Sequence, residues 1–151
     1  MGKTALAVMR LQPLHEGHRI LIDAMLASCE QVIIAVGSTQ ESGTDRNPYS
    51  YETRRTMILE HYGDCPELSV IPLVDIGAKN RGEWITYLCR ELANAGLPEP
   101  TDYFSGSQED ADWYIETGWE IHIIDRKTVG KGISATAIRR QLKAGVKEDR
   151  S

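Results

Sequence analysis

Short apolar runs alternate with amphipathic segments along nearly the whole chain. Runs rich in aliphatic and β-branched residues, closed by glycine, proline or polar residues, are typical of buried strands. They predict strands over 4–9, 31–38, 68–76 and 120–125, and a short strand and turn over 102–107. In the segments between and after these strands, apolar residues recur at helical spacing. They predict helices over 17–28, 51–62, 83–95, 108–118 and 134–145.

This alternation of strands and helices predicts the fold class. Repeated strand–helix–strand units form parallel sheets with helices on both faces. We therefore expect an α/β protein with a Rossmann-like, doubly wound parallel sheet of about five strands, as one domain over 1–151. Ligands bind such sheets beyond the carboxyl ends of the strands. The loops at that edge begin at Arg10, Ser38, Asp75, Ser105 and Asp125.

The composition narrows the class of protein. The 151 residues are 41% hydrophobic and 26% charged, which is typical of a soluble globular domain. A net charge of −5 argues against a broad nucleic-acid-binding surface, so an anionic ligand must be held by a local cationic site. Three cysteines without a CxxC pair indicate neither a zinc knuckle nor a disulfide framework. With no signal peptide and no membrane-spanning apolar run, we expect a cytoplasmic protein with no membrane contact.

The loop after the first predicted strand, RLQPLHEGHRILI (10–22), begins a helix with unusual residues. Ser, Thr, Asp or Asn usually cap a helix, whereas this one starts with His15, Gly17 and His18. A helix N-terminus attracts anions, and a glycine there lets a phosphate approach the backbone closely. Histidines three residues apart in the first turn can lie on the same side of the helix. A phosphate site explains the pattern, but surface or helix-capping histidines explain the pair alone equally well. A zinc pair is disfavoured, because HExxH spaces its histidines four apart and needs a third ligand.

The segment ISATAIRR (133–140) suggests a second phosphate site near the end of the chain. Ser134 is a good helix cap, Thr136 lies in the first turn, and Arg139 and Arg140 follow on the same helix. Hydroxyls, helix N–H groups and an arginine together can hold a phosphate. Taken alone, a capped amphipathic helix with solvated arginines is the simpler interpretation.

When the two loops are considered together, purely structural roles explain their residues less well than they do for each loop alone. Two helix N-termini at one sheet edge, with histidines and arginines, suit a polyphosphate that is undergoing transfer. No GxxxxGK[ST] loop occurs, and no cysteine or serine is paired with a base. The pattern therefore predicts transfer of a phosphoryl or nucleotidyl group by positioning and charge stabilisation, without a covalent intermediate.

Several motifs carry a resemblance to a known family. H-x-G-H after the first strand, combined with I-S-x-T-x-x-R near the end, resembles the nucleotidyltransferase superfamily. RLQPLHEGH is similar to the GRFQPFHxGH of archaeal-type nicotinamide-nucleotide adenylyltransferases, and GSTQESGTDRNPYSYETRRTMI is similar to their GSxQ…NPFTxxERxxMI segment. FSGS resembles their Y-S-G-N, and DRKTVGKGISATAIRRQL resembles their NRKEYSGTEIRRRM ending. The resemblance covers nearly the whole chain in order.

The resemblance implies roles for three groups of residues. His15, His18 and Arg139 would be catalytic, with His18 on the α-phosphate of ATP. ATP would also be bound by Arg10, Gln12, Gly17, Ser134, Thr136 and Arg140, with Gln12 and Pro13 shaping the first loop. The acceptor would be bound by Ser38, Asn47, Arg54, Asn80 and Trp84.

Two residues keep an alternative interpretation. Trp84 would stack on the nicotinamide ring, since an aromatic face suits a flat heterocycle. Without the resemblance, a core position on its helix is the better explanation of Trp84. Asp75 would make a polar contact at the edge of the third strand, or it would cap the following helix.

The resemblance implies the reaction ATP + nicotinamide mononucleotide → NAD + pyrophosphate. Mg²⁺ would bridge the phosphates as cofactor, with no metal-ligating residue predicted in the chain, and a homo-oligomer is compatible with the family. Other acceptors stay open, namely nicotinic acid mononucleotide, a pantetheine phosphate, or a CTP-dependent reaction. Because no cationic partner for a ring carboxylate is evident, the amide is favoured. A non-catalytic nucleotide sensor is the more distant alternative.

Overall fold

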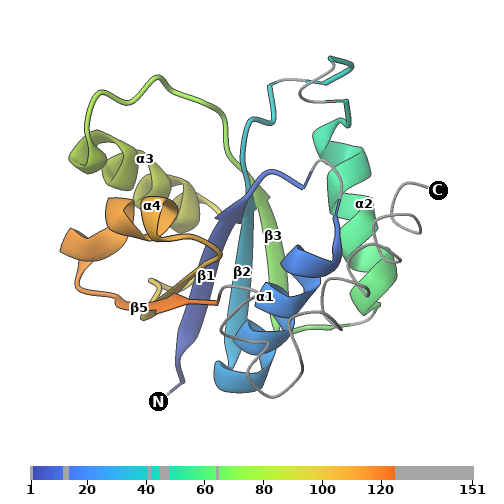
Figure 1. The fold of residues 1–151 in the computed structure, drawn as a ribbon, viewed down its shortest axis with the longest axis horizontal. Coiled ribbons are helices and arrows are strands. Elements are labelled where there is room, and N and C mark those ends of the chain that lie inside the picture. Colours follow the sequence, from blue (N-terminus) through green and yellow to red (C-terminus); the bar gives the residue numbers. More distant parts are fainter. Residues whose placement is uncertain (1, 12–13, 41, 45–47, 64, 125–151) are drawn as a thin grey trace.

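A five-stranded parallel sheet forms the centre of the protein in the computed structural model (Figure 1). The structure describes residues 2–11, 14–40, 42–44, 48–63 and 65–124. The strands are β1 (Thr4–Met9), β2 (Gln31–Val36), β3 (Leu68–Pro72), β4 (Asp102–Ser105) and β5 (Glu120–Ile123). Their spatial order is β3-β2-β1-β4-β5, and every neighbouring pair is parallel. The expected Rossmann-like α/β fold is confirmed.

Helices cover both faces of this sheet. They are α1 (Glu16–Ser28), α2 (Tyr51–Tyr62), α3 (Arg81–Asn94), the short α4 (Gln108–Ala111) and a 3₁₀ helix, η1 (Asp112–Thr117). Helices α1 and α2 lie on one side of the sheet, and α3 and α4 lie on the other (Figure 1). None of the described helices is long and apolar enough to cross a membrane.

The two faces of the sheet bury two separate cores, which explains why its central strands are almost continuously apolar. Along β2, Val32, Ile34 and Val36 pack with the residues of α1, whereas Ile33 and Ala35 pack with those of α3 and η1. This is the two-residue period of a strand with both faces covered.

Several expected boundaries differ from the structure, most of them by one or two residues; the second strand, for example, ends at Val36 rather than at 38. The third strand ends at Pro72 rather than at 76, because its partner β2 ends at Val36, which pairs with Pro72 in the last register position. The third helix starts at Arg81, two residues before the expected start. The expected helix over 108–118 splits into α4 and η1, and the tighter winding of η1 accompanies the burial of Tyr114 in the core. The expected helix over 134–145 lies outside the described residues.

The chain order places the site at the carboxyl edge of the sheet. The chain runs outward from β1 to β2 and β3, and then crosses over to β4 on the other side of β1. Strand order therefore reverses between β1 and β4, and such a switch point is where ligands bind in this architecture.

A buried arginine holds the loops at this edge together. Arg54, on α2, is 0% exposed. Its Nη1 donates to the carbonyl oxygens of Arg10 (2.9 Å) and Gly37 (2.7 Å), and its Nη2 donates to that of Ser38 (3.2 Å). Its Nε donates to the carbonyl of Ser50 at 3.3 Å. One guanidinium thus joins the ends of β1 and β2 to the start of α2.

These loops have strained backbone. Leu11 and Ser38 have φ values of 55° and 54°, in the left-handed region that residues with a side chain rarely adopt. Each lies at or next to a carbonyl that Arg54 holds. Burial, and next the charge of Arg10, lower the pKa of Arg54, and the carbonyl dipoles compensate its charge.

We expect Arg54→Ala to lower the free energy of unfolding by about 3 kcal/mol, since it leaves buried carbonyls without a donor. Arg54→Lys should lose less, because an ammonium keeps the charge but not the planar fork of donors. Urea denaturation measures both effects. Arg55→Ala is the control, because Arg55 is exposed on the same helix. Equal free energies of unfolding for Arg54→Ala and Arg55→Ala would contradict the role of Arg54 in joining these loops.

A second polar cluster stabilises the opposite, amino edge of the sheet. Asp102 is 2% exposed, accepts a hydrogen bond from the hydroxyl of Thr101 at 2.6 Å, and lies 2.7 Å from Nε2 of His122. Burial by itself raises the pKa of Asp102. The hydrogen bonds from Thr101 and His122, and the charge of Lys3, outweigh burial and hold this pKa below its ordinary 3.8.

The lowered pKa makes Asp102 stabilising above pH 3.8, and this contribution is lost as the pH falls through and below that value. We expect Asp102→Asn to have a lower Tm than the wild type at pH 7. The difference should shrink at pH 3, as thermal denaturation followed by circular dichroism would show. Glu60→Gln, at an exposed helix position, should show no such convergence. If the Tm difference between Asp102→Asn and the wild type grew on acidification, the stabilising role of the Asp102 carboxylate would be contradicted.

Candidate active site

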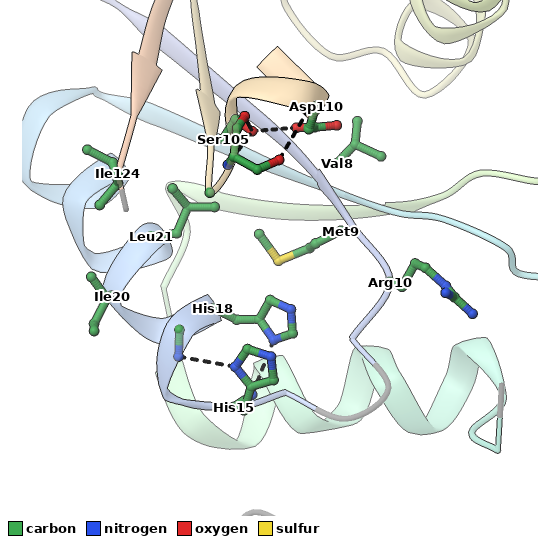
Figure 2. Close-up of a pocket in the computed structure, with 13 residues that line it drawn as sticks. Val8, Met9, Arg10, His15, His18, Ile20, Leu21, Ser105, Asp110 and Ile124 are labelled. Atoms are coloured by element: carbon green, nitrogen blue, oxygen red, sulfur yellow. Dashed lines mark hydrogen bonds between the residues drawn. The ribbon is translucent and has the colours of Figure 1, made fainter. Parts of the chain in front are cut away.

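A cleft of about 530 Å³ lies at the carboxyl edge, between β1, the start of α1 and the turn from β4 to α4 (Figure 2). One part of its lining is apolar and the other part carries polar groups. The apolar residues are Val8, Met9, Ile20, Leu21 and Ile124. The polar part consists of Arg10, His15, Gly17, His18, Ser105, Gly106, Ser107 and Asp110. Its volume and mixed lining are those of a small-molecule site.

The two histidines cap α1. His15 is the N-cap residue, and its Nδ1 accepts a hydrogen bond from the backbone N–H of Gly17 at 3.1 Å. Nδ1 of His18 accepts one from the backbone N–H of His15 at 3.2 Å, so the pair forms a reciprocal capping box. The rings are stacked, with centroids 3.8 Å apart. The imidazoles therefore replace the usual capping side chains.

Capping and phosphate binding are compatible, because they use different ring nitrogens. A ring nitrogen that accepts a hydrogen bond carries no proton, so both Nδ1 atoms are bare and each neutral ring carries its proton on Nε2. Both rings also line the cleft (Figure 2). The capping box thus fixes the tautomer that presents Nε2–H donors, beside the partial positive charge of the helix start.

The opposite wall of the cleft contains a carboxylate that the sequence did not single out. Asp110 Oδ2 accepts hydrogen bonds from the hydroxyls of Ser105 (2.7 Å) and Tyr103 (2.8 Å). Burial raises the pKa of Asp110, and the two hydroxyl donors offset part of that shift. The only sequence signal was the polar stretch SGSQED directly after β4.

A second cleft, of about 370 Å³, adjoins the first. The two share Val8 and Asp110. The second is lined further by Asp75, Ile76, Gly77, Ala78, Trp84, Trp113 and Tyr114. Its aromatic lining suits a flat heterocycle.

The position of Trp84 agrees with both of its interpretations, and stacking on a nicotinamide ring stays a prediction. Its ring packs against the core beneath α3 and also lines the second cleft. Its indole Nε1–H donates to the hydroxyl of Tyr114 at 2.9 Å, which fixes the orientation of the ring. Trp113, which is 39% exposed, lines the same cleft. Sequence reasoning missed Trp113, because it lies where α4 passes into η1, outside any regular pattern.

Three predicted acceptor residues have structural contacts. Asn80 caps α3, its Oδ1 accepting from the N–H of Glu83 at 2.9 Å. Ser38 is 7% exposed and donates to Asp75 Oδ2 at 2.8 Å. Asp75 therefore makes the expected polar contact at the strand edge, and the alternative that it caps the next helix is wrong. Direct contacts of Ser38, Asn80 and the buried Arg54 with the acceptor stay predictions.

The other predicted site residues lie outside the part of the chain that the structure describes. They are Gln12, Pro13, Asn47, Ser134, Thr136, Arg139 and Arg140. The structure thus brings together the first half of the predicted phosphate site, formed by Arg10, His15, Gly17 and His18. The second half stays a prediction.

Two places offer carboxylates to a cation. Asp102, Glu120 and His122 place three potential ligand atoms within 4.8 Å of one another. They lie on β4 and β5, with Asp102 and Glu120 at the amino ends, far from the carboxyl edge, and Asp102 and His122 already contact each other directly. In the first cleft, Asp110 is the only carboxylate among the described lining residues.

Comparisons with known proteins agree with this geometry. The model of the cytidylyltransferase-like family matches residues 10–141. The chain belongs to this family. The nicotinamide-nucleotide adenylyltransferase of Thermococcus onnurineus is 31% identical over 96% of the chain and 75% of its own length. The nicotinamide/nicotinic acid mononucleotide adenylyltransferase of Acinetobacter baylyi is 25% identical over 86% of the chain and 70% of its own length. The resemblance to archaeal nicotinamide-nucleotide adenylyltransferases is thereby confirmed.

Solved structures of NMN adenylyltransferases share the fold. A bifunctional NMN adenylyltransferase/ADP ribose pyrophosphatase from Francisella tularensis has a TM-score of 0.68 and 26% identity over 83% of this chain. A structure of such an enzyme from the same organism, complexed with AMP and a manganese ion, has a TM-score of 0.64 and 25% identity over 93%. The matched part is 38% and 41% of those chains, so this chain spans less than half of either.

We expect Tyr114→Phe to release the indole of Trp84, because it removes the hydroxyl that accepts the Nε1–H. The free energy of unfolding should fall by about 1 kcal/mol, and the tryptophan emission should change. Fluorescence-detected urea denaturation measures both. Tyr62→Phe is the control, since the Tyr62 hydroxyl donates to Asp23 and does not contact a tryptophan. An unchanged emission spectrum in Tyr114→Phe would contradict the positioning role of Tyr114.

Proposed function

We propose that this chain joins the AMP moiety of ATP to nicotinamide mononucleotide, giving NAD and pyrophosphate. The observation that carries the proposal is the pair of adjoining clefts at the switch point of the sheet. One cleft has the imidazole-capped helix start, and the other has two tryptophans. Relatives that carry this activity in their names support the same assignment.

The mechanism needs no nucleophile from the protein. The 5′-phosphate of the mononucleotide attacks the α-phosphorus of ATP. The bond between this phosphorus and the oxygen that bridges to the β-phosphate breaks, and pyrophosphate leaves. His18 Nε2–H and the N-terminus of α1 would donate to the α-phosphate oxygens, where negative charge builds up. The clefts meet at Val8 and Asp110, so the two substrates can be held side by side for this attack.

The triphosphate needs more positive charge than the described residues supply. Ser134, Thr136, Arg139 and Arg140 would hold the β- and γ-phosphates. Mg²⁺ bound to ATP neutralises phosphate charge and so lowers the repulsion between the substrates. The described lining of the first cleft fits an ion that is held mainly by the phosphates, because it offers a single carboxylate, Asp110. A cytoplasmic location and a homo-oligomer stay proposals.

We expect His18→Ala to lower kcat by about 10²–10³-fold, as for the loss of one preorganised donor to a transition state. The KM for ATP should change much less. Steady-state pyrophosphate release from ATP and nicotinamide mononucleotide measures both constants. His61→Ala, at an exposed position near the end of α2, is the matched control.

His18→Gln separates capping from catalysis. Glutamine at the third helical position can still accept the N–H of the capping residue, but it has no imidazole. We expect His18→Gln to retain the stability of the wild type and to lose kcat as His18→Ala does. Full kcat in either His18 variant would exclude the proposed role of His18.

The acceptor alternatives are separated by the same assay. Pyrophosphate release is measured with ATP and, in turn, nicotinamide mononucleotide, nicotinic acid mononucleotide and pantetheine phosphate, and with CTP in place of ATP. Binding of ATP without release with any acceptor would favour the nucleotide sensor instead. The name of the Acinetobacter relative includes both pyridine mononucleotides, so the choice between amide and acid is the closest of these alternatives.

A further inference from the structure

The described residues that line the second cleft carry charge of one sign only. Its described lining contains two carboxylates, Asp75 in the loop after β3 and Asp110 on α4. No lysine, arginine or histidine is among the described residues that line it. A ring that packs on the tryptophans of a cleft of about 370 Å³ therefore lies in a negative field.

The cations nearest along the chain line a different hollow. Lys79 and Arg81 form part of a separate depression that shares only Trp113 with the second cleft. Glu116 lines that depression as well, and offsets part of its positive charge.

Both carboxylates are held in place by hydroxyl groups. Ser105 and Tyr103 donate to the same oxygen of Asp110, Oδ2. Within the described residues, both hydroxyl hydrogen bonds go to Oδ2 and none goes to Oδ1, so Oδ1 can accept from a ligand in the clefts that Asp110 lines. The hydroxyl of Ser38 likewise donates to Oδ2 of Asp75. Such fixed carboxylates act on a ligand without first having to be ordered.

The two pyridine mononucleotides differ only in the group on ring carbon 3. Both carry a positive charge on the ring nitrogen, so both are attracted by the carboxylates. The amide adds a neutral N–H group, from which a carboxylate can accept a hydrogen bond. The acid instead adds a negative charge to the ring, and a carboxylate repels it. The fixed carboxylates would therefore discriminate chiefly through repulsion of the wrong substrate.

We propose that Asp110 and Asp75 set the acceptor specificity of this chain, selecting the mononucleotide with a carboxamide and rejecting the one with a carboxylate. The inference deepens the proposed function and rests on it. It assigns a specificity role to two residues on different elements, one on α4 and one in the loop after β3.

The test compares kcat/KM for nicotinamide and nicotinic acid mononucleotide, at saturating ATP, in the wild type and three variants. Asp110→Asn removes the charge at nearly constant shape. Asp75→Arg supplies a cation at an exposed position, where a larger side chain should not prevent folding. Asp112→Asn is the matched control, because Asp112 lies just beyond Asp110, accepts a hydrogen bond from Gln108 and lines neither cleft.

We expect the wild type to favour the amide at least about tenfold. Asp110→Asn should lower this ratio by about tenfold, mainly through a gain in kcat/KM for the acid. Asp75→Arg should lower the ratio further or reverse it, and Asp112→Asn should leave it unchanged. If Asp110→Asn fails to fold, as its thermal melt would show, Asp75→Arg decides by itself. A folded variant at either position with an unchanged ratio would overturn the role of that residue.

A binding measurement distinguishes failure of this inference from failure of the proposed function. If the wild type releases no pyrophosphate with either mononucleotide, the proposed function is wrong. Tryptophan-fluorescence titration with the same two compounds then tests the cleft directly, since Trp84 and Trp113 line it. Tighter binding of the amide than of the acid, with the difference lost in Asp75→Arg, would support the selectivity without turnover. Equal binding of the two compounds by the wild type would overturn it.

Discussion

The buried guanidinium of Arg54 is the interaction on which the site depends. It binds carbonyls at the ends of two strands, where Leu11 and Ser38 hold strained backbone, and it also binds the start of α2. Each of these loops leads to a wall of a cleft: Arg10 lines the first, and Ser38 holds Asp75 at the second. One side chain with no surface exposure thus sets the geometry of both substrate clefts.

The start of α1 shows how one pair of residues can satisfy two demands. Helix capping uses Nδ1 of each imidazole, and under the proposed function Nε2 of His18 would donate to the α-phosphate. An aspartate would cap the helix as well, but an ionised carboxylate offers no donor to a phosphate. Histidine at these positions would thus serve both the helix and the ligand.

The sequence was sufficient for the fold because its strands are apolar on both faces and its helices have clear periodicity. It also pointed to His15, His18 and Trp84, which belong to motifs and which line the two clefts, while their roles toward substrates stay predictions. It did not reveal Asp110 or Trp113, because their roles depend on α4 being short and on its passage into a 3₁₀ helix. Nor could it show that Arg54 and Asn80 bind backbone groups of their own chain, since such contacts leave no spacing pattern.

The two clefts have Val8 and Asp110 in common as lining residues. A molecule in either cleft would therefore lie against side chains that also line the other. If binding in one cleft shifts these shared side chains, the affinities of the two substrates are linked, and such a link is reciprocal: each substrate changes the affinity for the other by the same factor.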